Sequence, residues 1–196
     1  MERNNLYPLF LKVKNLEVLI VGGGFVAQEK LEFLLKSSPD ANVTMISPMY
    51  RKMTIEVANT GNVKLVEDIY NSDYLEGKHI VIATTDVPKV NIQVYEDCRA
   101  QSKLVNVADN PPYCDFYMGG IVTKGNVKVA ISTNGKSPTT AKRLRQFFEE
   151  VLPENIDDLV KNLNIYRKTI KGDFQQKVKT LNEFTKGLVE KKEYND

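Results

Sequence analysis

The sequence of 196 residues contains no tryptophan, a single histidine, His79, and only two cysteines, Cys98 and Cys114. With one histidine, a catalytic zinc site made of three histidines from one chain is excluded. The two cysteines do not form a C-x-x-C pair, so we expect each to be a reduced thiol and neither to hold a metal. No metal site is therefore predicted.

The chain also lacks a strong charge imbalance and any long apolar run. Its 27 Lys and Arg residues nearly balance its 25 Asp and Glu residues, which gives no sign of a nucleic-acid partner. No apolar stretch approaches the roughly 20 residues that a membrane-spanning helix needs. "MERNNLYPLF" lacks the charged and then apolar pattern of a signal peptide. We expect a cytoplasmic protein without a membrane partner.

The first half of the chain alternates strand-like and helix-like segments. Short β-rich apolar runs predict strands at 16–21, 42–47, 63–67, 79–85 and 104–108, and helical spacing predicts helices at 26–37 and 87–101. Such alternation is typical of a parallel sheet with helices on both faces. We therefore predict an α/β, Rossmann-type parallel sheet, with His79 as a buried structural residue of the fourth strand.

The pattern changes after residue 113. Residues 118–133 predict a β-hairpin that turns at Lys124-Gly125-Asn126, and Ser137 and Pro138 suit the start of a helix that Pro153 ends. Two apolar stripes at helical spacing follow, one formed by Ile156, Leu159, Val160, Leu163, Tyr166 and Ile170, the other by Phe174, Val178, Leu181, Phe184 and Leu188. We predict three parts: a Rossmann-type domain (1–113), a hairpin-plus-helix unit (114–150) and a helical C-terminal region (151–196).

A glycine-rich turn joins the first strand to the first helix in "VLIVGGGFVAQEK" (18–30). Gly22, Gly24 and Ala27 form the pattern G-x-G-x-x-A. The first glycine permits a tight turn, the second lets a pyrophosphate approach the backbone, and the small third residue lets helix and strand pack closely. Because the pattern follows a strand and opens a helix, it predicts dinucleotide binding. A purely structural turn is the alternative.

The acidic residue that usually binds the ribose 2′-OH is missing. It is expected about 20 residues after the turn, where this chain reads "ISPMYRK" (46–52). A serine hydroxyl or backbone groups would replace the carboxylate for NAD, whereas Arg51 and Lys52 would favour the 2′-phosphate of NADP, so the choice stays open. Thr84 and Thr85 stand at the carboxyl end of the fourth strand, at the same edge of the sheet, and are expected to contact the dinucleotide.

Further motifs resemble those of a known family. "VNVADNPPYCDF" (105–116) and "VAISTNGKSPTTAKRLR" (129–145), taken with the opening "YPLFLKVKNLEVLIVGGGFVAQEKLEFLL" (7–35), are similar to precorrin-2 dehydrogenase / sirohydrochlorin ferrochelatase, the NAD-dependent component of siroheme synthase. The resemblance implies NAD-dependent oxidation of precorrin-2 to sirohydrochlorin, in siroheme or cobalamin biosynthesis. It implies a homodimer formed through the middle unit. Some members also insert ferrous iron, an activity we expect to be weak or absent here.

The resemblance also assigns residues. Asp109 matches the catalytic aspartate, and a carboxylate at the carboxyl edge of a parallel sheet is well placed for general base work. Phe25, Val26, Ser47 and Pro48 match the NAD contacts. The substrate is expected to contact Asn106, Ser132, Thr133, Asn134, Lys136 and Ser137. Ser137 corresponds to a position phosphorylated in some relatives, and Asn134 stands where the family more often has glycine.

Other interpretations remain. Without the resemblance, Asp109 is typical of a turn aspartate before Asn110. A non-catalytic dinucleotide-sensing regulatory module is the main alternative, since the fold alone does not imply chemistry. A generic short-chain oxidoreductase is disfavoured, because we expect neither "YNSDYLEGK" (70–78) nor "YRKTIK" (166–171) to supply its Tyr-x-x-x-Lys pair.

Overall fold

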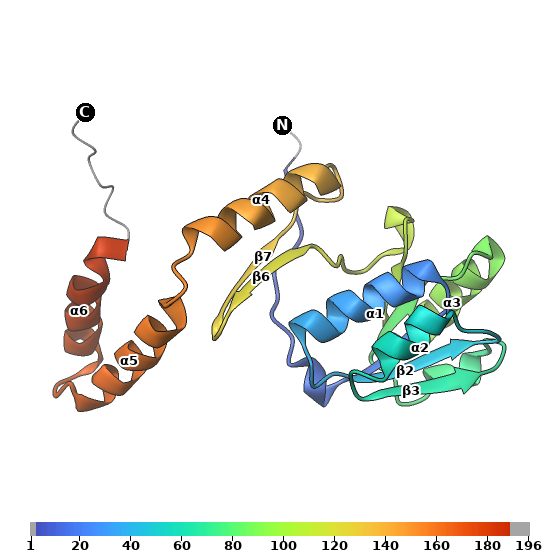
Figure 1. Ribbon diagram of the computed structural model, residues 1–196, viewed down its shortest axis with the longest axis horizontal. Helices are drawn as coiled ribbons and strands as arrows, with labels where there is room; N and C mark the ends of the chain where they lie inside the picture. The colour runs from blue at the N-terminus through green and yellow to red at the C-terminus, as the bar shows by residue number, and fades with distance from the viewer. Residues whose placement is uncertain (1–2, 189–196) are drawn as a thin grey trace. The chain divides into compact units, whose positions relative to one another are not determined.

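The computed structural model describes residues 3–188 and divides the chain into two compact units (Figure 1). Of the described residues, 3–120 and 131–141 form one unit, and 121–130 and 142–188 form the other. The strands are β1 Glu17–Val21, β2 Asn42–Ser47, β3 Val63–Glu67, β4 Ile80–Ala83, β5 Leu104–Val107, β6 Gly120–Lys124 and β7 Val127–Ile131. The helices are α1 Phe25–Ser37, α2 Lys52–Ala58, α3 Pro88–Ala100, α4 Pro138–Val151, α5 Ile156–Thr169 and α6 Phe174–Thr185, with short 3₁₀ turns η1 Val13–Asn15, η2 Ser72–Leu75, η3 Pro111–Tyr113 and η4 Lys186–Leu188.

The first unit is built on a five-stranded sheet in the order β3-β2-β1-β4-β5, and every pairing is parallel. β1 is central, with Val21 in register with Ile46 of β2 and Ala83 of β4. This confirms the predicted α/β architecture. The chain order reverses between β1 and β4, so their carboxyl ends mark the switch point where ligands bind in open sheets of this kind.

Each face of the sheet carries its own core. Val18 and Ile20 of β1 point to the side covered by α1 and α2, where they meet Leu31. Leu19 and Val21 point to the other side and belong to a cluster that includes Val94 and Cys98 of α3. Because β1 is buried on both faces from Val18 to Val21, these four residues are all apolar rather than alternating.

One helix of this unit was not predicted. α2 has only seven residues, and the two that it buries are Thr54 and Ala58. A helix this short with one small polar and one small apolar buried residue has no apolar stripe, so its sequence carries no helical period to detect.

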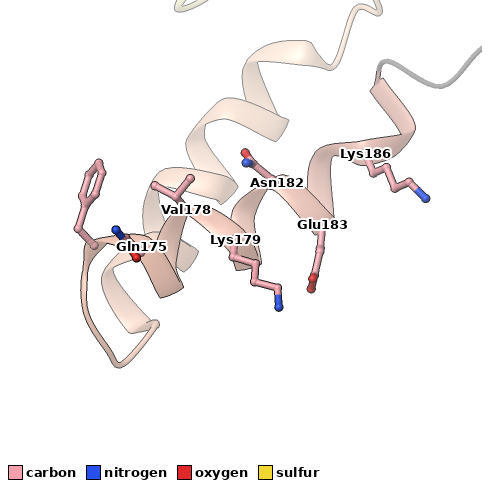
Figure 2. Close-up of a pocket in the computed structure, with 7 residues that line it drawn as sticks. Gln175, Val178, Lys179, Asn182, Glu183 and Lys186 are labelled. Carbon is pink, nitrogen blue, oxygen red and sulfur yellow. The ribbon is translucent and has the colours of Figure 1, made fainter.

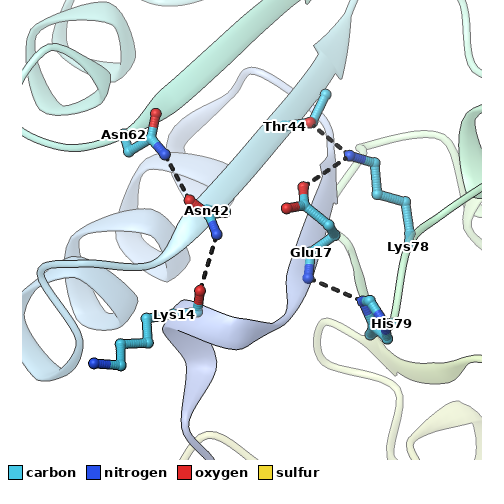
Figure 3. A network of polar contacts seen from close by, with 7 residues as sticks. All are labelled: Lys14, Glu17, Asn42, Thr44, Asn62, Lys78 and His79. Carbon is cyan, nitrogen blue, oxygen red and sulfur yellow. Dashed lines mark hydrogen bonds and ion pairs between the residues drawn. The ribbon is translucent and has the colours of Figure 1, made fainter.

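A polar network closes the amino end of the sheet (Figure 3). Asn62 donates to Asn42, which donates to the Lys14 carbonyl oxygen, with N···O distances of 2.6 and 3.0 Å.

The predicted burial of His79 was wrong, because β4 begins one residue later and His79 is exposed. Its Nδ1 atom accepts a 3.0 Å hydrogen bond from the Glu17 backbone N–H, so the predicted structural role holds.

The hairpin of β6 and β7 has the predicted turn, and α5 supports it within the second unit. Gly125 has φ +57°, and an added Cβ would lie 2.0 Å from the Asp157 carboxyl carbon. The same carboxylate accepts hydrogen bonds from the backbone and side chain of Asn126, at 2.6 and 2.7 Å. Bonds from Lys161 and Asn126 lower the pKa of Asp157 to about 2.

The remaining helices follow the predicted stripes closely. α6 starts at a capping box in which Asp173 and Gln176 bond each other's backbone N–H groups, and Gly172 at φ +117° provides the break before it. Tyr166 and Phe184 place their ring centroids 4.9 Å apart between α5 and α6. Ile170 lies just beyond the end of α5 rather than within it.

Candidate functional site

Three loops and one acidic residue gather at the carboxyl edge of the five-stranded sheet. The glycine turn follows β1, residues 48–51 follow β2, Thr84 and Thr85 follow β4, and Asp109 follows β5. The adjacent register of β2, β1, β4 and β5 brings them to one edge. These predicted residues come from segments far apart in the sequence, and parallel pairing is what assembles them.

The three glycines of the turn differ in what an added side chain would meet. Gly22 has φ +128°, and a Cβ there would lie 2.5 Å from the Thr84 hydroxyl oxygen. A Cβ on Gly23 would lie 2.2 Å from the Met49 carbonyl oxygen. Gly24 is exposed with φ −83°, and a Cβ there would meet no atom within 4 Å. Packing within the protein thus explains the first two glycines but not the third.

The open space beside Gly24 lies at the start of α1. Gly24 is the N-cap residue, and no side chain caps the backbone N–H groups of the first turn. Those groups and the positive end of the helix dipole suit an anion. A bare glycine facing open space in front of uncapped N–H groups fits the pyrophosphate of a dinucleotide. Val26 is half-buried and Phe25 is 62% exposed.

The segment after β2 is fixed against the glycine turn. The buried Ser47 hydroxyl donates to the Met49 carbonyl oxygen at 2.7 Å, and the Tyr50 hydroxyl lies 2.8 Å from the carbonyl oxygens of both Met45 and Val66. Burial raises the pKa of Tyr50. Pro48 is exposed at the tip of the segment. The Ser47 hydroxyl therefore shapes this loop, whose exposed side chains include those of Pro48, Met49 and Arg51.

The segment after β4 is held in the same way. The Thr84 hydroxyl is buried and donates to the Val21 carbonyl oxygen at 2.8 Å. Thr85 is half-buried, and its hydroxyl lies 2.7 Å from the Asn91 side-chain oxygen. The buried Thr84 hydroxyl therefore fixes the carboxyl end of β4 beside Gly22. Thr85 is the more accessible of the two threonines.

Asp109 is exposed and has φ +57°, one of three non-glycine residues with positive φ in the described chain. Aspartate tolerates this left-handed conformation better than most residues. The Ala108 backbone N–H donates to the Ala83 carbonyl oxygen at 2.9 Å and continues the β4–β5 pairing to the residue before Asp109. Asp109 thus lies beside the end of β4, at the carboxyl edge of the sheet.

Side chains from β5 and the following loop hold the backbone around Asp109. Asn106 is buried, and its amide donates to the Phe116 carbonyl oxygen at 2.7 Å. The Asp115 carboxylate accepts from the Val105 backbone N–H at 3.0 Å. The Cys114 thiol lies 3.2 Å from the Val107 carbonyl oxygen. The Asn106 side chain, which was predicted to contact substrate, instead holds this loop in place through its bond to Phe116.

Both cysteines are free, as expected. Burial raises the pKa of the Cys98 thiol to about 12 and also raises the pKa of Cys114. Neither is therefore a thiolate nucleophile near neutral pH. The part of the chain that the structure describes contains no group of three or more His, Cys, Asp or Glu residues placed to hold a metal ion.

Residues 132–137 form a compact loop before α4. Asn134 and Gly135 have φ +54° and +71°, so the asparagine adopts the conformation for which glycine is the usual choice. The Ser137 hydroxyl accepts from the Thr140 backbone N–H at 3.1 Å and caps α4, as predicted. Ser132, Thr133, Asn134 and Lys136 line a hollow of about 340 Å³ together with Arg3 and Asn4. Sequence reasoning missed Arg3, which lies far away in the chain and carries no motif.

A second hollow lies on one face of α6 (Figure 2). Val178, Lys179, Asn182 and Glu183 are among its lining residues. It contains none of the residues of the sheet edge.

One expectation about the sequence was wrong. Tyr74 and Lys78 do have the Tyr-x-x-x-Lys spacing of a short-chain oxidoreductase. The structure nevertheless separates their roles, because the Tyr74 hydroxyl bonds the Asp68 carboxylate and Lys78 lies at the amino end of the sheet, 2.9 Å from the Thr44 hydroxyl (Figure 3). Tyr74 and Lys78 therefore do not act as a catalytic pair at the carboxyl edge.

In residues 3–188, no helix is both long enough and apolar enough to cross a membrane.

Comparisons with known proteins agree with the resemblance seen in the sequence. A family model described as "Putative NAD(P)-binding" matches residues 9–120, and one described as "Sirohaem biosynthesis protein central" matches residues 124–150. The siroheme synthase of Pseudoalteromonas translucida (strain TAC 125) is 37% identical over 172 residues, covering 88% of this chain and 34% of the relative. That of Psychrobacter sp. (strain PRwf-1) is 37% identical over 176 residues, covering 90% and 34%. The chain thus spans about a third of the length of these relatives.

A solved structure described as "SirC, precorrin-2 dehydrogenase" has the same fold. It superposes with a TM-score of 0.71 at 22% identity, covering 91% of this chain and 89% of that one. The likeness includes the Rossmann-type sheet, the hairpin and the helical C-terminal region.

Proposed function

We propose that this chain, which belongs to the family described as "Putative NAD(P)-binding", oxidises precorrin-2 to sirohydrochlorin with NAD as the hydride acceptor. One observation carries the proposal: Gly24 leaves an open position before α1, and Asp109 is held at the same edge of the sheet. The similarity to siroheme synthases and to a precorrin-2 dehydrogenase supports the choice of substrate.

Different parts of the site bind the nucleotide, position it and accept the proton in this reaction. The backbone N–H groups at the start of α1 bind the pyrophosphate, and the segments after β2 and β4 position the two ends of the dinucleotide. When bound, the nicotinamide supplies the acceptor for the hydride. Asp109 accepts the proton that must leave the ring as the new double bond forms, which is general base catalysis.

The loop of residues 132–137 binds the tetrapyrrole in this proposal. Precorrin-2 carries several carboxylates, and the loop offers hydroxyl groups, the Lys136 ammonium and the start of the 14-residue helix α4. Arg3 adds a second cation to the lining of the same hollow. The arrangement favours binding of an anionic ligand.

Iron or cobalt insertion is at most a weak second activity. Asp109 is the matched oxygen donor for it, and the single histidine, His79, lies at the opposite end of the sheet. The two reduced cysteines are in keeping with a cytoplasmic enzyme.

The first test is turnover by the intact protein. Anaerobic mixing with precorrin-2 and NAD is expected to give the absorbance of sirohydrochlorin and reduced nucleotide in equal amounts. Calorimetric titration with NAD should accompany the assay. NAD binding without turnover would contradict the proposal and favour the alternative of a dinucleotide-sensing regulatory module.

We also propose a homodimer formed through the middle unit, residues 114–150. The apolar side chains of Leu144, Phe147 and Val151 on α4 are 39, 54 and 50% exposed, and a hairpin with one helix buries little core alone. Phe147→Asp is expected to shift the protein from dimer to monomer at micromolar concentration in sedimentation velocity, because a charge replaces a large apolar contact. Gln146→Asp adds the same charge to the adjacent position and should leave the dimer intact. A wild-type protein that sediments as a fully active monomer would refute the dimer.

A further inference from the structure

The loop that carries Asp109 is fixed to β5 at its far end. The Asp115 backbone N–H donates to the Val105 carbonyl oxygen at 2.8 Å, and the Asp115 carboxylate accepts from the Val105 N–H at 3.0 Å. The Asn106 amide donates to the Phe116 carbonyl oxygen at 2.7 Å. These contacts bring the end of the loop back beside the strand from which it started, but they do not reach the turn that contains Asp109 itself.

Asp109 occupies the third position of a β-turn formed by residues 107–110. The Asn110 backbone N–H closes the turn on the Val107 carbonyl oxygen at 3.1 Å. A positive φ at this position is usually supplied by glycine or asparagine, whereas here aspartate adopts φ +57°. A negative φ would be less strained and would direct the carboxylate elsewhere. Strained backbone of this kind persists only where the surrounding structure holds it.

The Cys114 thiol contacts both ends of this turn. Its sulfur lies 3.2 Å from the Val107 carbonyl oxygen and 3.4 Å from the Asn110 carbonyl oxygen. The Asn106 amide nitrogen lies 3.4 Å from the same sulfur. A thiol is both a weak donor and a weak acceptor, so it can donate its proton to the carbonyl groups and accept from the amide. Burial raises the pKa of Cys114, which keeps that proton in place at neutral pH.

We propose that Cys114 is a positioning residue for the oxidation of precorrin-2, because its thiol ties together the two ends of the turn that holds Asp109 at positive φ. The inference rests on the proposed dehydrogenase function, in which Asp109 is the base. Cys114 neither touches the substrate nor transfers the proton. It acts through the geometry of one turn, and a misplacement of about 1 Å can cost on the order of 100-fold in rate.

A packing role is the alternative, since a free cysteine often behaves as a small apolar side chain. The surroundings of Cys114 do not favour it, because the side chain is only half-buried and its sulfur contacts three polar groups. Cys98 shows the contrast. It is fully buried and belongs to an apolar cluster that includes Val94 and Val105.

The test is single-turnover oxidation of precorrin-2 at saturating NAD, with NAD affinity and melting temperature recorded for every variant. Cys114→Ala and Cys114→Val both remove the donor, and valine suits the extended backbone of residue 114, at φ −117° and ψ 123°. Both are expected to lower the rate by about 10- to 100-fold with NAD affinity unchanged. Cys114→Ser restores a donor and should recover most of the lost rate.

A matched control and a double variant separate positioning from stability. Cys98→Ala leaves a cavity in the core and should lower the melting temperature while the rate stays that of the wild type. In Asp109→Asn the base is already absent, so adding Cys114→Ala should lower the residual rate no further. Should the alanine variant fail to fold, Cys114→Val takes its place in both comparisons.

Three results would overturn the inference. They are wild-type rates in Cys114→Ala and Cys114→Val, no recovery in Cys114→Ser, and an equal loss from Cys114→Ala with or without Asp109. In each case turnover by the wild type would still support the proposed function. A wild type that binds NAD without oxidising precorrin-2 would overturn both.

Discussion

Asp109→Asn is expected to lower the turnover of precorrin-2 by about 10²- to 10⁴-fold, the usual cost of removing a positioned general base. Asparagine is the appropriate substitution because residue 109 has φ +57°, a conformation that asparagine tolerates and alanine does not. The change therefore removes the proton acceptor and leaves the loop that Asn106 and Asp115 anchor. The measurement is single-turnover absorbance with saturating nucleotide.

The control for this variant is Asp40→Asn, which removes an exposed carboxylate just before β2, at the other end of the sheet. It should oxidise precorrin-2 at the wild-type rate. NAD affinity and melting temperature should stay unchanged in both variants. Near-normal turnover by Asp109→Asn would remove the aspartate from the mechanism.

Gly24→Asp is expected to weaken dinucleotide binding by at least about 100-fold while the protein keeps its melting temperature. Gly24 has an ordinary φ of −83° and open space where a side chain would begin, so the fold accepts the substitution. A carboxylate there faces the pyrophosphate, and two like charges about 4 Å apart repel by several kcal/mol near a protein surface. Calorimetric titration and thermal unfolding are to be run together.

Two further variants separate the causes. Gly24→Asn adds similar bulk without charge and should lose less affinity than Gly24→Asp. Gly22→Ala should instead lower the melting temperature, because φ +128° and the Thr84 hydroxyl 2.5 Å from the new Cβ leave it no room. If Gly24→Asp bound NAD as the wild type does, the glycine turn would have only a structural role.

The sheet and its edge were predictable because their signals are local. An apolar run ending in Gly22 marks a strand and its turn, and parallel pairing then determines which residues share an edge. α2 escaped because its seven residues bury only Thr54 and Ala58. His79 was misplaced because β4 begins one residue later, at Ile80.

The finer assignments depend on contacts that sequence does not encode locally. The amide of Asn106 was expected to face substrate, yet it holds the Phe116 carbonyl ten positions away. Arg51 was recognised only as a cation near the ribose, since nothing in a linear pattern reveals that its guanidinium carbon lies 5.5 Å from the centroid of the Phe25 ring. Tertiary packing decides which side chains meet across loops, and the spacing of apolar residues along the sequence does not predict those contacts.

The way in which the loop after β2 is anchored separates its backbone from one of its side chains. The backbone is tied down by Tyr50, by Gly23 and by the Thr54 hydroxyl, which donates to the Gly23 carbonyl oxygen at 3.0 Å. The Arg51 side chain takes part in none of these bonds. Position 51 can therefore carry other side chains that keep a backbone N–H without loss of the bonds that hold this loop, so the charge displayed beside the glycine turn can vary on an unchanged scaffold.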